Sequence, residues 1–428
     1  MTVLIFLGSL LGAMSLGMPI AFALIVCGIC LMIYQGNFDA QILAQNLLEG
    51  TNNYPLMAVP FFMLAGELMN AGGMSHRIIA MAQALVGHIR GGLGYVTIIG
   101  AIVMASISGS AVADSAALAA VLIPLMRKSG YNIPRSAGLI AAGGIIAPVI
   151  PPSIGFIVFG VAAQVSITKL FMAGIVPGLM MALTLWVTWT ICARREAPPV
   201  DPEQQSFDMG RLKKAVKEGL WALGLPIIII GGMKFGVFTP TEAAVVAVVY
   251  ALFVGMFVYR ELTFRSLPKL MLSAAQVSSV VMFLVACAMT SAWLITIADV
   301  PAQISELLSP FMDNKMLLMA VMMGLVILVG TSLDFMPTVL ILTPVLMPLV
   351  EEAGIDPVYF GVMFIMNNSI GLLTPPVGTV LNVVAGVSRV DLGKVIKGVL
   401  PFLLAQISLL ALFILFPDLI MVPAKWFY

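Results

Sequence analysis

Charged residues are scarce in this chain, and their scarcity excludes most classes of soluble protein. Only 10% of the 428 residues are Asp, Glu, Lys or Arg, whereas 61% are hydrophobic. A soluble globular domain usually carries charge on about a quarter of its residues. The formal net charge of +1 provides no basic face to hold phosphates, so we expect no nucleic-acid partner. The composition predicts an integral membrane protein in contact with lipid.

Histidine and cysteine are also rare, which excludes most catalytic arrangements. The chain has two histidines and four cysteines. An intramembrane protease or acyltransferase needs a nucleophile paired with a base. Neither His76 nor His88 lies in an apolar span near a repeated serine, and no GxxxxGK[ST] loop is present to bind a nucleotide. We therefore predict that the protein is not an enzyme and has no bound cofactor.

What the chain does contain is a repeat marked by proline. Four prolines recur at one interval of 224 residues, the difference between 348 and 124. The pairs are Pro124 and Pro348, Pro151 and Pro375, Pro152 and Pro376, and Pro177 and Pro401. Proline accounts for only 26 residues of the chain, so chance is a poor explanation. We predict a duplicated unit, with repeats at 1–193 and 220–428. In an apolar protein, paired interrupted segments in two halves point to a transporter's binding site.

One long polar stretch separates the two repeats. Residues 194–219 are expected to be a linker, and three prolines would prevent an early helix there. The stretch holds Arg194, Arg195, Pro198, Pro199, Pro202, Arg211, Lys213, Lys214 and Lys217. An excess of Lys and Arg in a short loop marks the cytoplasmic side of a membrane. We expect residues 209–217 to form a short amphipathic helix on the membrane surface.

From this cytoplasmic linker, the apolar runs predict an all-α polytopic membrane protein. We expect ten crossings, two re-entrant hairpins and both ends of the chain outside. Scaffold spans and an arm fall within 1–90 and 220–297, and closing spans lie at 170–193 and 398–420. Residues 3–34 are expected to turn near their middle. Further spans are expected near 54–72, 220–236, 239–259 and 272–297, with the arm at 76–90.

A hairpin is predicted in the second repeat because its two apolar arms are short. The arms at 316–329 and 335–349 hold 14 and 15 residues. At 1.5 Å per residue each reaches about 21–23 Å, which is less than the hydrocarbon thickness of about 30 Å. Asp313 lies before the first arm and Glu351 after the second. These acidic flanks predict a hairpin that enters from outside.

The first repeat contains an equivalent hairpin with flanks of opposite charge. Its arms are expected at 91–107 and 114–126, next to Arg90, Arg127 and Lys128. These cations predict entry from the cytoplasm. Equivalent segments that enter from opposite faces are typical of an inverted-topology repeat.

Each hairpin is followed by a span that proline interrupts. The hairpin and interrupted span together cover residues 91–165 in the first repeat and 314–388 in the second. Residues 133–165 contain one Pro-Pro pair, and residues 357–387 contain the other. Proline removes a backbone donor and clashes with the preceding turn, so the helices must unwind there. Unwound backbone at membrane depth is tolerated only where protein or a cavity satisfies it. We therefore expect each hairpin tip to lie against a helix break.

Polar residues and glycines gather at these tips and breaks. The candidate substrate- and ion-binding residues are Ser106, Ser108, Gly109, Ser110, Asp114, Pro151, Pro152 and Ser153 in the first repeat, and Gly330, Thr331, Ser332, Asp334, Asn368, Thr374, Pro375, Pro376, Gly378 and Thr379 in the second. Hydroxyl, carboxylate and carbonyl oxygens suit a small hard cation. Helix C-terminal ends favour Na⁺, and N-terminal ends favour a substrate carboxylate.

Two sodium sites with an organic anion between them are therefore predicted. One site lies near Ser108, Ser110 and Pro151, and the other near Thr331, Ser332 and Thr374. Structural roles stay open for the same residues, because Ser and Thr can cap short helices and mediate close helix packing.

The carboxylates in apolar surroundings have alternative roles as well. Asp114 and Asp334 are costly inside a membrane and are functional candidates for that reason. Each also lies at the start of a returning arm, where it could cap the helix. Glu67 and Glu242 fall outside the repeated segments, so we expect them to make hydrogen bonds within the scaffold.

Four motifs resemble the large membrane subunit of tripartite ATP-independent periplasmic (TRAP) transporters. They are PFFMLAGELM at 60–69, SGSAVAD at 108–114, GIIAPVIPPS at 144–153 and GLLTPPVG at 371–378. The resemblance covers essentially the whole chain. Within the family, the chain resembles members that import keto sugar acids such as 2,3-diketogulonate.

This resemblance implies Na⁺-coupled import of a small organic acid across the bacterial cytoplasmic (inner) membrane. It implies two partners, which are a small four-helix membrane subunit and a periplasmic substrate-binding protein. It also implies an elevator mechanism, in which a transport domain at 91–165 and 314–388 moves against a scaffold. The alternative is a sodium/organic anion symporter of similar architecture that needs no binding protein.

Overall fold

Helices make up the fold, and the residues that the structure describes include no strand. The computed structural model describes residues 2–196, 208–299, 302–303, 306, 310–312 and 314–427. The predicted linker prolines Pro198, Pro199 and Pro202 and the predicted hairpin flank Asp313 lie outside these residues. The all-α class that the sequence predicts is confirmed.

Short helices form the N-terminal end of the fold. The predicted turn within 3–34 separates α1 (Thr2–Ser15) from α2 (Ile20–Tyr34). The next helix, α3 (Ala40–Thr51), was not predicted; Asp39 caps it by accepting hydrogen bonds from Gln41 N and Ile42 N. After it come α4 (Ala58–Ala71) and α5 (Met74–Val86), which are the predicted span and arm.

Both predicted hairpins are helical. The first consists of α6 (Gly92–Ser108) and α7 (Ala111–Lys128), and the second of α15 (Lys315–Gly330) and α16 (Phe335–Glu352). The returning arm α7 begins three residues earlier than predicted because Ser110, rather than Asp114, caps it. Entry of the two hairpins from opposite membrane faces stays a prediction.

Both interrupted helices are present as well. The first break separates α8 (Ile133–Gly144) from α9 (Ile154–Ala162), and the second separates α17 (Pro357–Gly371) from α18 (Thr379–Ser388). At each break the peptide bond between the two prolines is cis. The two equivalent segments of the repeat therefore share one unusual backbone feature.

One predicted element is wrong. The expected surface helix at 209–217 and the expected span at 220–236 form a single helix, α11 (Met209–Lys234). No residue between them stops a helix, and Gly219 allows α11 to pack on α5, where a methyl group at this position would lie 3.2 Å from Met81 Sδ. The amphipathic stretch is therefore the first part of a long helix.

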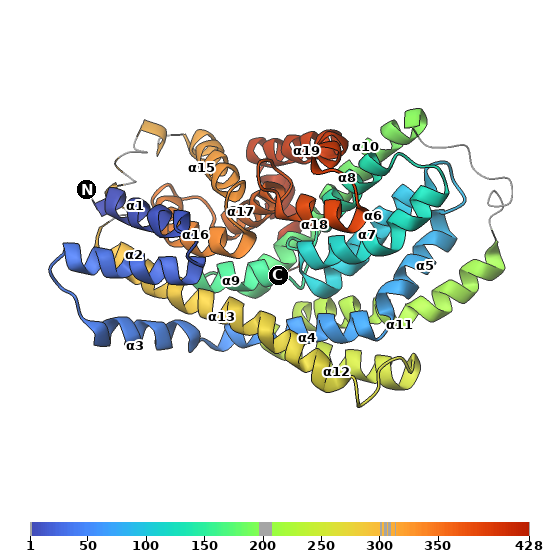
Figure 1. Ribbon diagram of the computed structural model, residues 1–428, viewed down its shortest axis with the longest axis horizontal. Coiled ribbons are helices and arrows are strands. Elements are labelled where there is room, and N and C mark those ends of the chain that lie inside the picture. Colours follow the sequence, from blue (N-terminus) through green and yellow to red (C-terminus); the bar gives the residue numbers. More distant parts are fainter. Residues whose placement is uncertain are drawn as a thin grey trace.

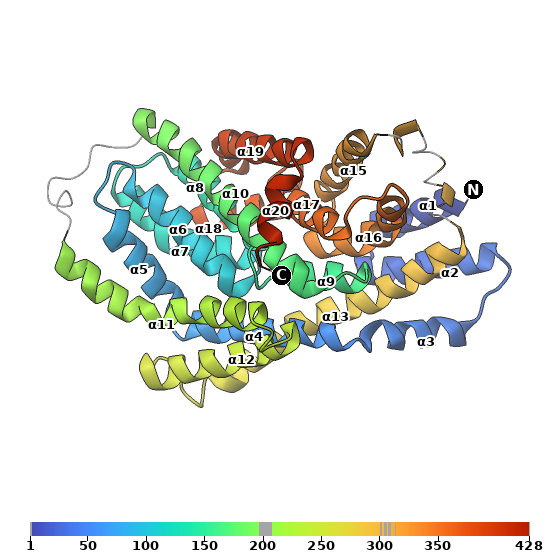
Figure 2. The ribbon, with the colours of Figure 1, turned by 180° about the vertical axis from the view of Figure 1, so that it is seen from behind.

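Long helices complete the chain. They are α10 (Ile167–Glu196), α12 (Pro240–Phe253) with a π-helical turn at Val254–Val258, α13 (Leu267–Ile297), α19 (Leu392–Leu415) and the short α20 (Asp418–Ala424). Figure 1 shows α13 running along α2 and α3 toward α4 and α12, and the packing of these helices agrees. Figure 2 shows α10 beside α19 and α20 on the opposite side.

Several helices are suited to a membrane. In the described residues, six are long and apolar enough to cross one, or up to seven if the bent pair of α4 and α5 is one span. The prediction of ten crossings counted α1, α2 and both interrupted helices, whereas the six include α16, which has 18 residues and was predicted as a 15-residue hairpin arm too short to cross. Helices α1 and α2 and each piece of the interrupted helices are shorter than the about 20 residues that a crossing needs. A polytopic membrane protein is confirmed.

The closing helices pack tightly on the broken helices and the first hairpin. Helix α19 packs most extensively on α8, where Arg135 Nη1 donates a 2.8 Å hydrogen bond to the Gly398 carbonyl. In α10, Trp189 Nε1 donates to the Gly91 carbonyl at 2.9 Å. Gln406 of α19 donates to the Met181 carbonyl of α10 at 3.0 Å. The first two bonds join α19 and α10 to the segments that carry the tips and breaks, and the third joins α19 to α10.

Because α8 and α19 are in close contact, we predict that one methyl group added between them lowers the stability of the protein. In Gly398→Ala, the new Cβ would lie 2.0 Å from the Pro134 carbonyl oxygen, so backbone must shift. Such overpacking costs about 1–3 kcal/mol, and we expect a clearly lower melting temperature of the purified protein. Gly324→Ala is the matched control, since nothing lies within 4 Å of its Cβ and alanine favours helix. Equal melting temperatures for the two variants would contradict the packing.

Candidate functional site

The first hairpin tip lies against the first helix break. Gly109 connects α6 to α7 with a φ of 62°, which favours glycine. A Cβ at Gly109 would lie 2.8 Å from the Pro152 carbonyl oxygen and 3.4 Å from Ser153 Cα. Only a residue without a side chain permits this approach. Pro151, Pro152 and Ser153 are all buried.

A buried carboxylate lies at this first tip. Ser108 Oγ donates a 2.5 Å hydrogen bond to Asp114 Oδ1 and accepts one from Ser110 N at 3.1 Å. Asp114 is only 1% exposed, and its Oδ2 has no hydrogen-bond partner among the described residues. The capping role left open for Asp114 belongs instead to Ser110, which accepts a bond from Ala113 N. Asp114 is therefore free to act on a ligand.

The second tip lies against the second break in a similar way. A Cβ at Gly371 would lie 3.1 Å from Gly330 C and Cα. Asn368 Nδ2 donates to the Phe335 carbonyl at 2.8 Å, while its Oδ1 is buried without a partner among the described residues. The tip is thus held from both the α17 backbone and an α17 side chain.

Asp334 joins the second tip to the far side of the break. It occupies the N-cap position of α16, yet its side chain makes no capping hydrogen bond. Instead Asp334 Oδ1 accepts a 3.4 Å bond from Thr379 Oγ1 at the start of α18. Its backbone carbonyl accepts a bond from Thr338 Oγ1 at 2.9 Å. Gly378, with a φ of 48°, precedes Thr379 and begins α18.

Several hydroxyl groups of the candidate binding residues make hydrogen bonds to nearby backbone, as a role in capping or packing helices would require. Ser106, Thr331 and Thr374 each donate to a carbonyl of their own helix. Ser153 donates to the Pro148 carbonyl and caps α9 by accepting from Phe156 N at 3.1 Å. Among the described residues no hydrogen bond joins Thr374 to Thr331 or Ser332. In each predicted sodium trio one hydrogen bond joins the two tip residues, Ser110 N to Ser108 Oγ at 3.1 Å in the first and Thr331 Oγ1 with Ser332 Oγ at 3.5 Å in the second.

The two tip–break units meet each other. A Cβ at Gly155, two residues after the first break, would lie 2.7 Å from Phe335 Cζ at the start of α16. Helix α9 packs along α16, and Phe159 of α9 lies 5.6 Å from Phe364 of α17 between ring centroids. The predicted binding residues of both halves therefore lie in one central region.

The two units differ in exposure. Pro151, Pro152 and Asp114 are buried, whereas their second-half counterparts Pro375 and Pro376, and also Asp334, are exposed. The first unit is covered in part by α16. One copy of the repeated site is thus closed and the other is open.

Two further residues lie next to the site although they are not among the candidate binding residues. Ser115 Oγ is buried without a hydrogen-bond partner among the described residues, and it lies so close to Gly144 that a side chain there would clash. Gly66, in the motif at 60–69, faces Ser108, and a Cβ there would lie 3.7 Å from Ser108 Cα. In the sequence, Gly144 and Gly66 were the residues that could have indicated these close approaches.

The two scaffold carboxylates make the hydrogen bonds expected of them. Glu67 accepts a 3.3 Å hydrogen bond from Ser273 Oγ. Glu242 forms a capping box with Thr239 at the start of α12. In the part of the chain that the structure describes, no group of three His, Cys, Asp or Glu residues could hold a metal ion. A cation would therefore depend on hydroxyl, carbonyl and single carboxylate oxygens.

Known proteins share both the sequence and the fold. The chain is 56% identical over 426 residues to the 2,3-diketo-L-gulonate TRAP transporter large permease protein YiaN of Escherichia coli, covering 100% of each chain. It is 38% identical over 411 residues to the sialic acid TRAP transporter large permease protein SiaM of Vibrio cholerae, covering 95% of each. The crystal structure of the Alcanivorax borkumensis YdaH transporter has a similar fold, with a TM-score of 0.61 and 13% identity over 88% of this chain and 89% of that chain.

The family assignment follows from these matches. Residues 7–419 match the family described as the DctM component of tripartite ATP-independent periplasmic transporters. Both sequence relatives are named as transporter permeases, which confirms the prediction that the chain is not an enzyme. The chain belongs to the DctM family of large permease components of TRAP transporters.

Proposed function

We propose that this permease imports a small organic acid, of carboxylate, keto-acid or sugar-acid type, into the cytoplasm with Na⁺ as the coupling ion. The observation that carries this proposal is the buried Asp114–Ser108 pair, whose free carboxylate oxygen lies at a tip closed against a helix break. Relatives named for 2,3-diketo-L-gulonate and sialic acid transport support an anionic sugar acid as substrate.

The helix ends at the first tip and break carry partial charges that suit the proposed Na⁺ and substrate carboxylate. The C-terminal ends of α6 and α8 carry carbonyls without intrahelical partners, and they favour a cation. The N-terminal ends of α7 and α9 favour a carboxylate. Ser108, Ser110, Asp114 and the backbone near Pro151 would hold the first Na⁺. Thr331, Ser332 and Thr374 would contribute to a second, which the exposed tip leaves accessible.

Partners and location follow from membership of a tripartite family. We propose a separate small four-helix membrane subunit and a periplasmic binding protein that delivers the substrate. The complex would lie in the bacterial inner membrane.

For an elevator motion, we propose that α10 and α19 move with the hairpins and broken helices rather than with the scaffold. The hydrogen bonds of Arg135, Trp189 and Gln406 support this boundary. Moving α8 away from α19 would break the close approach of Gly398 to the Pro134 carbonyl and the hydrogen bond from Arg135 to the Gly398 carbonyl.

The energy available from Na⁺ is sufficient for accumulation. Each net positive charge that moves inward at about −100 mV yields roughly 2.3 kcal/mol. A tenfold sodium gradient adds about 1.4 kcal/mol per ion. Two ions carried with a monovalent acid would therefore support strong accumulation.

Coupling to sodium predicts a simple dependence on the external cation. Thermal-shift screening of the cognate binding protein with sugar acids first identifies its ligands. These ligands, radiolabelled, are then used as substrates for the complex in proteoliposomes. Uptake should stop when choline replaces Na⁺ at fixed pH. Unchanged uptake in choline would refute the coupling, and uptake without the binding protein would favour an independent symporter.

The first tip predicts specific effects of two substitutions. Ser108→Ala and Asp114→Asn each remove part of a charged hydrogen-bonded pair worth about 1.5–3 kcal/mol. We expect the Na⁺ concentration for half-maximal uptake to rise about tenfold or more, and the melting temperature to fall for Ser108→Ala, which leaves Asp114 Oδ1 without its donor. The matched control is Ser408→Ala, because Ser408 is exposed and donates only to the Leu404 carbonyl of its own helix. Equal Na⁺ dependence in all three variants would contradict the site.

A further inference from the structure

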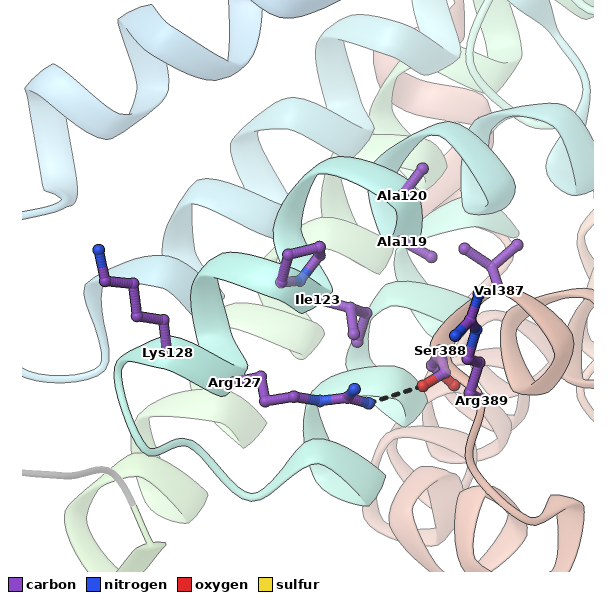
Figure 3. Close-up of a pocket in the computed structure, with 9 residues that line it drawn as sticks. Ala119, Ala120, Ile123, Arg127, Lys128, Val387, Ser388 and Arg389 are labelled. Atoms are coloured by element: carbon purple, nitrogen blue, oxygen red, sulfur yellow. Dashed lines mark hydrogen bonds between the residues drawn. The ribbon is translucent and has the colours of Figure 1, made fainter.

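A basic pocket lies away from the tips and breaks, between the first hairpin and the second broken helix. The last turns of α7 and the end of α18 line it, and its volume is about 480 Å³. Figure 3 shows Arg127 reaching from α7 to the Ser388 carbonyl, with Arg389 rising from the end of α18. The Arg127 Nη2–Ser388 O distance is 2.8 Å. The pocket therefore joins the two repeats at one end of the fold.

The cations of this pocket lack counter-charges. Arg127, Lys128 and Arg389 line it, and none has an ion-pair partner among the described residues. Arg127 uses one of its five N–H donors on Ser388. Asp391, two residues after Arg389, caps α19 by accepting from Lys394 N at 3.3 Å, and it forms no ion pair with these cations in the described part of the chain.

Helix stability alone does not explain this arrangement. Basic residues in the last turn of α7 interact favourably with the helix dipole, which accounts for Arg127 and Lys128 individually. Arg389, however, ends α18 in a left-handed conformation with a φ of 54°, where glycine or asparagine would be the usual residue. The backbone of Arg389 caps α18 through its N–H, so the cap itself does not require the guanidinium, which lines the pocket instead.

The remaining wall of the pocket is apolar. Ala119, Ile123 and Val387 line it beside the cations. A pocket that is basic at one end and apolar along one side matches a phospholipid, with its phosphate at the guanidinium groups and its first acyl carbons on the apolar wall. A free sugar acid would leave that wall without a partner.

The neighbouring surface carries the same charge. A second pocket, of about 230 Å³, is lined by Arg135, Lys394 and Lys397. Of these three cations, only Arg135 has an ion-pair partner in the described residues, Glu196 at 3.1 Å. The sequence places this end of the hairpin on the cytoplasmic side, where basic pockets between membrane helices bind anionic headgroups.

We propose that the pocket between α7 and α18 binds the phosphodiester headgroup of an anionic phospholipid from the cytoplasmic leaflet. The phosphate contacts Arg127 and Arg389, with Lys128 adding positive charge at the rim. A lipid held there bridges α7 of the first repeat and α18 of the second, and it stabilises their contact.

Purified protein in neutral detergent tests this site. Melting temperature and native mass spectrometry are measured with phosphatidylglycerol, phosphatidylcholine or inorganic phosphate added at equal concentration. We expect phosphatidylglycerol alone to raise the melting temperature and to remain bound. Lys128→Gln and Arg389→Gln should each weaken this binding about fivefold. Neither side chain makes a hydrogen bond within the described part of the chain, so both variants should fold.

Arg265→Gln is the matched control, since it removes an exposed cation from the connection between α12 and α13. Its binding of phosphatidylglycerol should equal that of the unmodified protein. Equal stabilisation by phosphatidylcholine would overturn the role of charge. Equal stabilisation by inorganic phosphate would show that the pocket binds free phosphate as well as it binds a lipid, and would overturn the proposal of a lipid headgroup. Unchanged phosphatidylglycerol binding in the Lys128→Gln, Arg389→Gln double variant would overturn the location.

Discussion

The fold depends on one constraint, which is that backbone polar groups at membrane depth need partners. Hydrocarbon offers no water, so only backbone that is buried in protein or lines a cavity can leave a helix there. Two Pro-Pro pairs create free helix ends at the breaks. In both halves a hairpin tip covers the break, and glycine makes the approach possible, as at Gly109 against Pro152 and Gly371 against Gly330. Because these contacts are made by backbone, a tip and its break have to stay together.

The same chemistry occurs in two different environments. The break of the first unit is buried, with α9 packed on α16, and the unit holds a carboxylate oxygen without a hydrogen-bond partner in the described residues. The second unit is open, and its carboxylate, Asp334, bridges to Thr379 across the break. An unpaired buried carboxylate is unfavourable unless a cation or proton compensates it. Ligand binding is therefore expected to matter most for the closed unit.

Two ion pairs tie separate elements of the fold together. Arg77 bonds Glu261 at 2.6 Å and lies 3.9 Å from the Tyr259 ring centroid, which joins α5 to the segment after α12. Arg135 bonds Glu196 and the Gly398 carbonyl, which joins α8 to α10 and α19. The cations around α7 and α18 are different, because they face a pocket without acidic partners. Their location next to an apolar wall is the reason for assigning them to lipid.

The amino-acid sequence by itself determined the helical class, the two helix pairs with short tips and the two breaks, while the duplication and the re-entrant course of the hairpins stay predictions. These features depend on local properties, namely apolar run length and the inability of proline to continue a helix. Because polar residues are costly in apolar segments, the sequence also indicated candidate binding residues. They include Ser108, Asp114, Asn368 and Asp334. The continuity of α11 escaped prediction because the change from a charged to an apolar stretch indicates a boundary, although no residue there stops a helix. The existence of α3 escaped prediction because α3 is short and has no long apolar run.

Only the tertiary structure decided which partners those residues take. It assigned the cap of α7 to Ser110, freed Asp114 to bond Ser108, and linked Asp334 to Thr379 across 45 residues. It also decided that one unit is buried while its repeat is exposed, and that Arg127 meets Ser388. The physical reason is that hydrogen-bond partners and burial depend on how distant segments pack, whereas helix formation and interruption depend on neighbours along the chain.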